Sequence, residues 1–373
     1  MITDVNPFIY SRPLAPEDVM DRDPETAKLL ELAVGGHYVR LYAPRKFGKT
    51  SLLGRALRHG ERDEGLIPVM VDLYGGLSIA DIAVRIERAY AKHLKGAIRK
   101  AADKALKSSG LGLSLGAYGL SAKLQLDPKI DPLPALHALL DLPLRLEAGG
   151  GYRALIVFDE FQDIGKVTDM DALLRAHIQY QGEVASYVFS GSQSGMMEQL
   201  FENKDRPLYG SAVPMRLGRL ENEDIADYVA TRFAETDRDA GEGLHPLLAS
   251  AKGHPQRAVQ LAHRLWEEVP RGGMASFETW ERAHEAALEE LDPEFVAHWR
   301  GLETSDQKAL RAIVSGRGSP LSGTVLQQRN AEKTTTQHAL QRLVASSDVE
   351  REASQYVIVD PLFAEWIDRL RGV

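Results

Sequence analysis

The sequence feature that most constrains the fold is a short loop that ends in Gly-Lys-Thr. It follows a strand-length apolar run at residues 38–42 and precedes a helical pattern at residues 51–57. Strand, loop and helix in this order form the context of a phosphate-binding loop. Ala43 stands where such a loop usually begins with glycine. The residues that follow Ala43 are Pro44, Arg45, Lys46, Phe47, Gly48, Lys49, Thr50 and Ser51.

The chemistry of this loop predicts a nucleotide ligand, held by residues 44–51. Backbone N–H groups of the loop and of the following helix N-terminus would bind the β-phosphate. Gly48 lets the backbone approach closely, Lys49 would reach the β- and γ-phosphates, and Thr50 would hold Mg²⁺. We therefore expect ATP or ADP with Mg²⁺. The alternative is a chance strand–turn–helix that happens to contain Gly-Lys-Thr.

Two carboxylates follow a second buried strand. The apolar run at residues 154–158 ends in Asp159 and Glu160. In a phosphate-loop NTPase the first carboxylate lies near Mg²⁺, and the second is placed to polarise the attacking water. We assign Asp159 to the metal and Glu160 to the base, with a solvated carboxylate pair as the alternative. At the end of another strand, Ser192 and Gln193 are candidates to touch the γ-phosphate, although a Gly/Ser turn explains them equally well.

The apolar runs indicate an α/β fold. They are continuously apolar rather than alternating, as strands of a parallel sheet are when both faces are buried, and helical patterns separate them. The runs lie at residues 38–42, 67–73, 154–158 and 186–189. Helices alone follow from about residue 222, and short helices with a strand pair follow from about residue 303. We predict an α/β module at 1–220, a helical module at 221–298 and a small α+β module at 299–373.

Composition excludes several classes of protein. A chain of 373 residues usually forms two or three domains. It contains no Cys, which excludes disulfides, Cys-ligated zinc, iron–sulfur clusters and thiol nucleophiles. The net charge of −8 argues against a chain that is basic throughout. No apolar run approaches 18 residues and the first residues do not resemble a secretory signal, so we expect a cytoplasmic protein with no membrane span.

A basic insertion is predicted at about residues 85–128, between the phosphate loop and the acidic strand. Residues 85–107 carry eight basic and two acidic side chains, a local charge of +6. Arg88, Lys92, Lys95 and Arg99 would share one helical face. Residues 111–126 alternate in polarity around a Gly-containing turn, which predicts a β-hairpin. The insertion is a candidate contact for a protein partner, for self-association or for a polyanion; the alternative is a solvated face that covers the sheet.

The last module has the helix–helix–helix–hairpin order of a winged helix. Its third helix would expose side chains suited to contact DNA. A protein contact or a lid is the alternative role for this module. The candidate DNA contacts are Lys333, Gln337, His338 and Arg342.

With these motifs in place, the chain resembles the archaeal-type ATPase family, which is related to the AAA+ proteins and belongs to the STAND group of NTPases. The resemblance implies a sheet of strand order 5-1-4-3-2, a helical lid and a C-terminal winged helix. It also implies that His254 and Pro255 lie against the nucleotide and that Arg22 approaches the adenine. From the residues alone, 253–255 is only a turn and a helix start. The matching stretches are 6–8, 21–23, 44–53, 71–74, 159–162, 190–192, 207–210, 253–255 and 360–366.

One departure from the family concerns the arginine that many AAA+ rings supply to a neighbouring subunit. Family members commonly carry it after the Pro-Leu-Tyr-Gly stretch, where this chain has Ser211. Arg206, Arg216 and Arg219 are nearby candidates for the role, and surface ion pairs are the alternative.

The sequence therefore predicts an Mg²⁺-dependent ATPase that acts as a switch, with ATP between core and lid and with partner-stimulated or slow turnover. A DNA-binding regulator that holds nucleotide as a structural ligand is the alternative. A self-assembling scaffold is a third hypothesis.

Overall fold

The computed structural model describes residues 5–76, 78–111, 114–116, 119–127, 129–328 and 332–370. Its centre is a five-stranded parallel sheet of order β2-β3-β4-β1-β5. This is the order 5-1-4-3-2 that the family resemblance implied, so the predicted α/β fold is confirmed. The strands are β1 (Val39–Tyr42), β2 (Ile67–Asp72), β3 (Ala154–Asp159), β4 (Ala185–Gly191) and β5 (Val213–Arg216).

Burial explains which strands the sequence revealed. Every residue of β3 and β4 is buried, as their continuously apolar sequences predict. Strand β5 is short, contains Pro214 and is largely exposed at the sheet edge. It therefore has no continuous apolar run from which a strand could be predicted. The phosphate loop and the acidic pair follow β1 and β3, at the carboxyl edge of the sheet.

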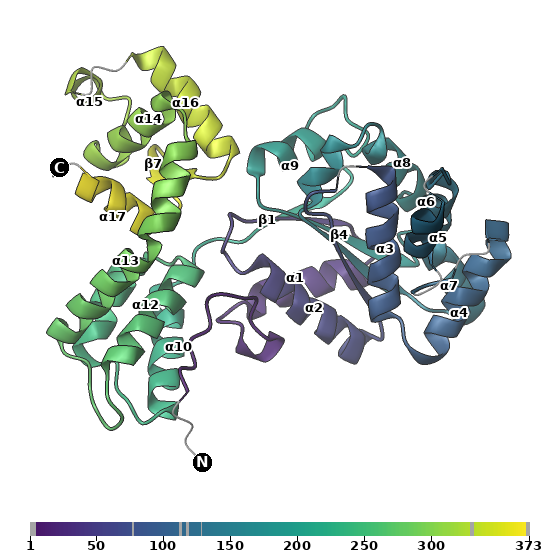
Figure 1. Ribbon diagram of the computed structural model, residues 1–373, viewed down its shortest axis with the longest axis horizontal. Helices are drawn as coiled ribbons and strands as arrows, with labels where there is room; N and C mark the ends of the chain where they lie inside the picture. The colour runs from purple at the N-terminus through teal and green to yellow at the C-terminus, as the bar shows by residue number, and fades with distance from the viewer. Residues whose placement is uncertain are drawn as a thin grey trace.

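Helices cover both faces of the sheet (Figure 1). One face packs on α1 (Asp23–Val34) and α2 (Lys49–Glu64). The other face packs on α3 and on helices drawn from the chain between β2 and β5. These are α3 (Ile79–His93), α4 (Gly96–Leu106), α5 (Leu120–Leu126), α6 (Leu133–Leu140), α7 (Leu142–Gly150), α8 (Met170–Ile178), α9 (Ser194–Phe201) and the short helices η2 (Lys107–Leu111) and η3 (Phe161–Lys166).

The β-hairpin predicted in the insertion is wrong. Residues 120–126 form helix α5, because Leu120 and Leu124, four residues apart, pack on the same core. Helix α5 is held by Glu87, whose buried carboxylate accepts the N–H groups of Gly116 at 2.8 Å and Ser121 at 3.4 Å. The turn predicted at residues 116–119 includes residues 117 and 118, which lie outside the described residues.

The single basic helix face predicted for this insertion is also wrong. The helix ends at His93 and a new one begins at Gly96, whose φ of 56° breaks the periodicity. Arg99 then turns inward and donates to the carbonyl oxygens of Ala91 and Leu115. The exposed lysines of the segment remain at the surface.

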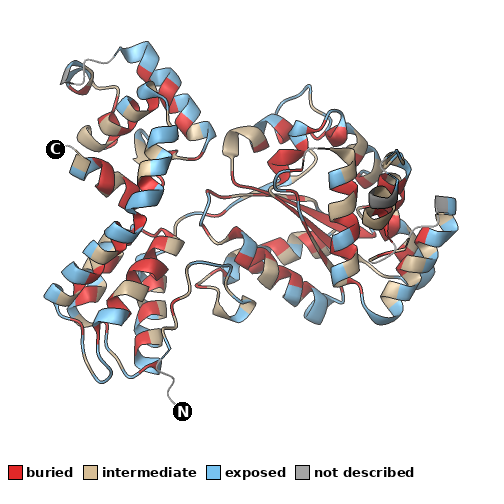
Figure 2. Cartoon of the chain, viewed as in Figure 1, coloured by how far each residue is buried: buried red, intermediate tan, exposed pale blue. Residues whose placement is uncertain are grey.

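The second half of the chain forms one connected hydrophobic core. Four helices come first: α10 (Asn222–Glu235), α11 (Leu244–Ala251), α12 (Pro255–Glu268) and α13 (Phe277–Gly301), with the short helix η4 (Gly241–Gly243). The C-terminal unit follows, with α14 (Thr304–Ser315), α15 (Gly323–Gln328), α16 (Lys333–Ala345), β6 (Val349–Glu352), β7 (Gln355–Ile358) and α17 (Pro361–Arg369). Figure 2 shows buried residues running without interruption from α10–α13 into this unit.

The C-terminal unit has the predicted order of three helices and a hairpin. Helix α17 is an addition after the hairpin, and it packs on α13 and α14. The boundary predicted between residues 298 and 299 falls within the last turn of α13, so the division into modules stays a prediction.

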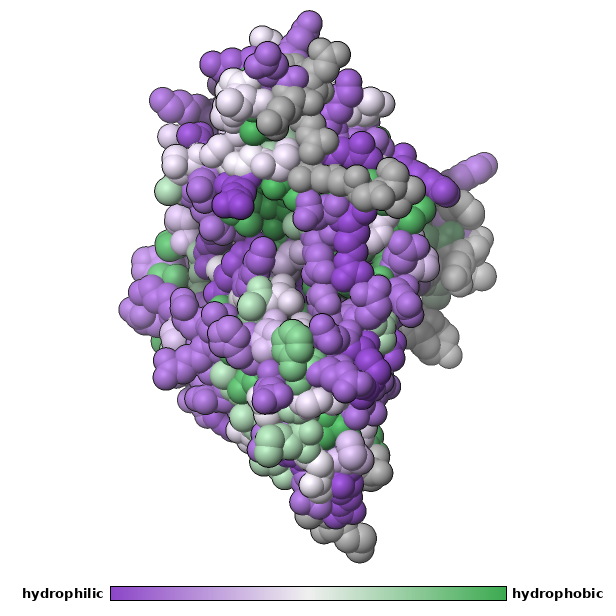
Figure 3. All heavy atoms as spheres, turned by 90° about the vertical axis from the view of Figure 1, so that its left-hand side faces the viewer, coloured by the Kyte–Doolittle hydropathy of each residue, from purple (hydrophilic) through white to green (hydrophobic). Residues whose placement is uncertain are grey.

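The N-terminal arm crosses from the α10–α13 helices to the sheet-containing part (Figure 1). Phe8 is buried against Phe233 of α10, and the arm contains the short helix η1 (Pro16–Asp18). Within the part of the chain that is described, none of the helices has the length and apolar character needed to cross a membrane. The face formed by α10–α17 is mostly hydrophilic, with apolar side chains in small groups (Figure 3).

Candidate functional site

The phosphate loop joins β1 to α2 through two residues in the left-handed region of φ. Lys46 has a φ of 69° and Gly48 a φ of 83°. A Cβ atom on Gly48 would meet nothing within 4 Å, so the backbone conformation rather than crowding favours glycine there. Helix α2 has no side-chain cap at its N-terminus. Its first N–H groups are therefore available to an anion, as the sequence predicted.

Lys49 lies buried behind the loop. Its Nζ donates to the carbonyl oxygens of Ala43 at 3.2 Å and Pro44 at 3.5 Å, which are long bonds for an ammonium group. Burial lowers the pKa of Lys49, while Glu160 and Asp159 oppose that shift. A phosphate oxygen would be a better acceptor than either carbonyl, so the environment of Lys49 fits a nucleotide phosphate.

The structure brings the two predicted metal residues together. Thr50 Oγ1 donates to Asp159 Oδ2 at 3.1 Å, and Ser190 Oγ donates to Asp159 Oδ1 at 2.8 Å. Burial raises the pKa of Asp159. The described residues contain no group of three or more His, Asp or Glu side chains that could hold a metal. One hydroxyl and one carboxylate fit Mg²⁺, which keeps several waters and is bound together with substrate phosphates.

Glu160, the predicted base, is fixed by two neighbours. Its backbone has a φ of 49°, which turns it away from β3. Ser192 Oγ donates to Glu160 Oε2 at 2.7 Å, and Gln162 Nε2 donates to the same oxygen. Ser192 thus orients the carboxylate. Gln162 was missed as a site residue, although it lies in the Asp-Glu-Phe-Gln stretch; Gln193 precedes α9 and does not line the cavity described next.

A cavity of about 390 Å³ opens over the loop between the arm and α12. Lys49, Thr50 and Glu160 are among the residues that line this cavity. Leu14 of the arm donates its N–H to Ser51 Oγ at 3.0 Å and so fixes the arm to α2. The other residues that line the cavity are Ile9, Tyr10, Ser11, Arg12, Pro13, Leu14, Val19, Met20, Arg22, Arg45, Lys46, Phe47, Gly48, Ser51, Tyr74, Pro255, Gln256 and Val259.

Arg22 lines the cavity but its guanidinium is already engaged. It donates to Glu25 at 2.5 Å and to the carbonyl of Gly218 at 2.8 Å, and the residue is buried. The structure therefore places Arg22 where it fixes the start of α1 against the chain after β5.

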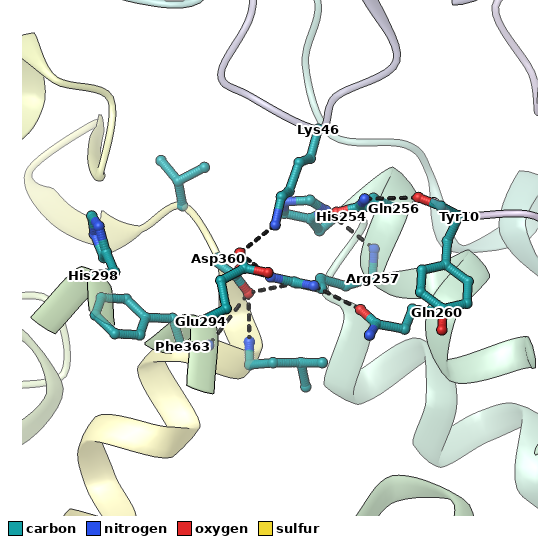
Figure 4. Close-up of polar contacts among 12 residues, drawn as sticks. Tyr10, Lys46, His254, Gln256, Arg257, Gln260, Glu294, His298, Asp360 and Phe363 are labelled. Atoms are coloured by element: carbon teal, nitrogen blue, oxygen red, sulfur yellow. Dashed lines mark hydrogen bonds and ion pairs between the residues drawn. The ribbon is translucent and has the colours of Figure 1, made fainter. Parts of the chain in front are cut away.

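Pro255 lines the cavity, whereas His254 lies behind the loop. The His254 ring packs edge-on against Phe47, with ring centroids 4.8 Å apart. Its Nδ1 accepts the N–H of Arg257 at 3.3 Å (Figure 4). Burial lowers the pKa of His254 to about 3, so the ring is neutral. His254 is thus a helix cap that packs on Phe47, and of the residues at 253–255 only Pro255 lines the cavity.

The tip of the loop is tied to distant parts of the chain (Figure 4). Lys46 Nζ forms an ion pair with Glu294 of α13. Arg257 of α12, which is only 1% exposed, donates from Nη2 to Asp360 at 2.5 Å and lies 3.6 Å from Glu294. Asp360 in turn caps α17 by accepting the N–H of Leu362.

The three arginines considered for a role in a neighbouring subunit all make contacts within the chain, and the cavity lining includes none of them. Arg206 pairs with buried Asp171 at 2.9 Å, and Arg216 pairs with Glu350 at 3.0 Å. Arg219 donates to the carbonyls of Lys252 and Val359. Their positions agree with the alternative interpretation, ion pairs and structural contacts.

The candidate DNA contacts lie on α16. Lys333, Gln337 and His338 are exposed. Arg342 is turned toward α14, where it pairs with Asp306 at 2.6 Å and Glu303 at 2.9 Å.

Comparisons with known proteins identify the fold. A scan against protein-family models finds no match, and a search of curated proteins also finds none. The Walker-type ATPase PABY2304 of Pyrococcus abyssi has a similar solved structure, with a TM-score of 0.70 and 19% identity over 96% of this chain and 99% of that one. The Aeropyrum pernix ORC2 protein in ADPNP–ADP complexes gives a TM-score of 0.60 and 14% identity over 99% of both chains. The Aeropyrum pernix ORC1 protein in complex with DNA gives 0.50 and 16% over 95% of both. The chain therefore has the AAA+-like fold of these archaeal ATPase and ORC structures.

Proposed function

We propose that this chain is an Mg²⁺-dependent ATPase of the AAA+/STAND type that acts as a molecular switch. The observation that carries the proposal is that an uncapped helix N-terminus, a buried lysine and Glu160 line one cavity, with Asp159 bonded to Thr50 beside them. The similar solved structures include a Walker-type ATPase and an ORC2 protein with bound ADPNP and ADP, which supports a nucleotide in this cavity.

Each residue at the loop has a separate task in the reaction ATP + H₂O → ADP + phosphate. The N–H groups of α2 and the Lys49 ammonium bind the phosphates and neutralise their charge. Glu160, held by Ser192, accepts a proton as the water oxygen bonds to the γ-phosphorus. The bond from that phosphorus to the bridging oxygen breaks, and its electron pair leaves on ADP. Thr50 and Asp159 would hold Mg²⁺, which would supply positive charge that stabilises the phosphates.

The contacts of the loop tip support a switch rather than an isolated hydrolase. Lys46 pairs with Glu294 and Phe47 packs on His254, so the loop touches both α13 and the start of α12. A change of the loop with nucleotide state would alter these contacts, and the Arg257–Asp360 pair continues from α12 to α17. Nucleotide state can thereby bias the position of the C-terminal unit.

A DNA-binding regulator that never turns nucleotide over is the second candidate. The exposed side chains of Lys333, Gln337 and His338 on α16 favour it, and one similar structure is an ORC1 protein in complex with DNA. Duplex binding that falls steeply with salt and survives Lys49→Ala would support this candidate. For the switch, the partner surface is proposed at either α16 or the exposed lysines of residues 85–128.

Phosphate release and nucleotide binding, measured on the same samples, test the proposal. Wild type should release phosphate from Mg·ATP, and Lys49→Ala should lose binding. Glu160→Gln should bind ATP normally and lose turnover, whereas Glu64→Gln, an exposed carboxylate at the end of α2, should behave as wild type. Turnover by Glu160→Gln at the wild-type rate would overturn the assignment of the base. Tight binding with no turnover in the wild type would favour the regulator.

A further inference from the structure

The structure sorts the charged side chains of the segment at residues 85–107 into an inner and an outer set. Both acidic residues of the segment belong to the inner set. Glu87 is buried and holds α5. Asp103 accepts the N–H of Leu115 at 2.8 Å and pairs with Arg99 at 3.2 Å. Both carboxylates are therefore engaged inside the insertion.

The three arginines of this segment are also engaged by the chain itself. Arg85 donates to the carbonyl oxygen of Asp72 at 2.9 Å, and Arg88 donates to the hydroxyl of Ser121 at 3.0 Å. Arg99 is turned inward, toward two carbonyl oxygens. The basic face predicted from the sequence included Arg88 and Arg99, so the surface left for a ligand differs from the predicted one.

The five lysines of the segment form the outer set. Each is exposed, and none forms a hydrogen bond or an ion pair with another residue that the structure describes. Exposed cations elsewhere do pair with carboxylates, for example Lys28 with Glu31 at 3.0 Å and Arg58 with Glu17 at 2.7 Å. The chain has 53 acidic and 45 basic residues, so five unpaired lysines in one segment run against its composition. They are Lys92, Lys95, Lys100, Lys104 and Lys107.

Three of these lysines share one face of α4. Lys100, Lys104 and Lys107 are four and three residues apart, which places them on one side of the helix along about 10 Å of its axis. Lys107 directly follows α4 and keeps a helical backbone, with a φ of −64°. Glu147, the exposed carboxylate of α7, forms no ion pair with them, although α7 packs on α4. We call these three residues the lysine surface; it lies at the edge of the molecule opposite to the C-terminal unit (Figure 1).

Three ammonium groups on one helix face repel one another, and an extended anion that neutralises them would stabilise them. The side chains around them restrict which anion fits. No large apolar or aromatic side chain is exposed between residues 96 and 110, all of which the structure describes. A protein interface is centred on such side chains and is depleted in lysine. A membrane-bound helix and a single-stranded nucleic acid also need them, for insertion and for stacking. The phosphate backbone of a duplex requires only cations.

We propose that the lysine surface binds the phosphate backbone of duplex DNA and does not read the base sequence. The proposal names a partner for the switch proposed above; its regulatory role rests on that function, whereas the binding itself needs no turnover. About 10 Å of duplex axis carries about three phosphates on each strand, so each lysine can meet one phosphate. Recognition of RNA relies on contacts to the 2′-OH. The hydroxyl of Ser108, beside the lysine surface, already donates to the carbonyl of Ala105, so DNA is the duplex that this surface fits.

Salt-dependent binding of a labelled DNA duplex of about 20 base pairs, followed by fluorescence anisotropy without nucleotide, tests the proposal. Each phosphate contact contributes about 0.9 to the slope of log affinity against log salt concentration. Between about 50 and 200 mM salt, Lys100→Gln, Lys104→Gln and Lys107→Gln combined should reduce this slope by about 2.7. The same triple glutamine variant should raise the Kd at about 100 mM salt by about tenfold or more. The corresponding triple arginine variant keeps the charges and should keep the slope of the wild type.

A matched control removes three positive charges from other parts of the surface. Lys28→Gln, Lys204→Gln and Arg271→Gln combined should leave the slope within about 0.5 of the wild-type value. Lys333→Gln examines α16 separately. Each single glutamine variant of the lysine surface should lower the slope by about 0.9, so the test does not depend on the folding of one triple variant.

The proposal is refuted if the triple glutamine variant changes the slope no more than the control does, or if the wild type does not bind the duplex at about 50 mM salt. A slope that falls only in Lys333→Gln would assign the DNA contact to α16 and refute it too. Tighter binding of a duplex RNA, a polyglutamate peptide or phosphatidylserine vesicles than of DNA would have the same consequence. Failure of the ATPase proposal looks different: the wild type would release no phosphate from Mg·ATP, while these slopes stay as expected.

Discussion

Removal of the Arg257 guanidinium should destabilise the chain, because it breaks a buried ion pair between α12 and the start of α17. Arg257 donates to Asp360 from Nε at 2.9 Å and from Nη2 at 2.5 Å, and from Nη1 to Gln260 at 2.6 Å. The side chain is 1% exposed, whereas that of Asp360 is 21% exposed. Although burial of Asp360 opposes it, the charge of Arg257 keeps the pKa of Asp360 below its usual value.

The magnitude follows from this burial. Breaking a buried ion pair by removing one partner costs about 3–5 kcal/mol, since the other charge stays buried without compensation. We expect Arg257→Met to cost about 3 kcal/mol, the low end of that range, because Asp360 retains some contact with water. Asp360→Asn should cost a similar amount, since asparagine keeps the N-cap of α17 but leaves Arg257 unpaired. The double variant should cost about 2 kcal/mol less than the sum of the two.

Urea unfolding followed by tryptophan fluorescence measures these free energies in the helices that the Arg257–Asp360 pair joins. The four tryptophans are at positions 266, 280, 299 and 366, all in α12, α13 and α17. Arg300→Met, on the exposed surface of α13, is the matched control and should change the unfolding free energy by less than about 0.5 kcal/mol. If the double variant loses as much unfolding free energy as the two single variants together, the argument that this pair holds α17 to α12 is refuted.

Three further predictions concern the surroundings of the site. His254 has a pKa of about 3 in the folded chain and about 6.5 in the unfolded chain, so the unfolded state binds more protons between these pH values. The free energy of unfolding should therefore fall as the pH is lowered. Between pH 7 and pH 5 the wild type should lose about 2 kcal/mol more than His254→Asn, which keeps the helix cap. Glu87→Ala should lower the free energy of unfolding in urea by about 2–3 kcal/mol, since two N–H groups lose their buried acceptor. A decrease below about 0.5 kcal/mol would contradict the role of Glu87. Glu294→Gln removes the half-exposed ion pair in which Glu294 would compete with nucleotide for Lys46. It should therefore lower the Kd for ATP, measured by calorimetry, by up to about fivefold. A higher Kd would show that the pair does not compete with nucleotide.

The sequence predicted the sheet well because its evidence was local. The loop after β1, the acidic pair after β3 and the continuous apolar runs each lie within a few residues. The edge strand β5 was not seen, since half-exposed residues and Pro214 produce no apolar run. The strand order itself came from the family resemblance, because periodicity carries no information on which strands are neighbours.

The predictions that failed depended on contacts between distant residues. Alternating leucines at residues 111–126 suggested strands, but Glu87, more than 25 residues earlier, supplies the acceptor that holds helix α5. The arm could not be recognised as a wall of the cavity for a similar reason: its contacts with Ser51 and with α12 join segments that no local pattern relates. His254 was expected against the nucleotide, and its place behind Phe47 becomes visible only when α12 is packed on the loop.

Neighbouring residues of the phosphate loop serve two different sides of the molecule. Lys49 lines the cavity together with Glu160, whereas Lys46 and Phe47 line it and also contact Glu294 and His254. The positive φ angles at Lys46 and Gly48 allow so short a segment to turn twice between these sides. Because these residues are consecutive in the chain, the loop cannot change its hold on a phosphate without shifting the contacts of its tip. His254 begins α12, Arg257 lies within the first turn of that helix, and Asp360 begins α17. Three contacts thus lead from the phosphate side to the C-terminal unit, and a variant at Arg257 should weaken the response of that unit to nucleotide while leaving the residues of the reaction in place.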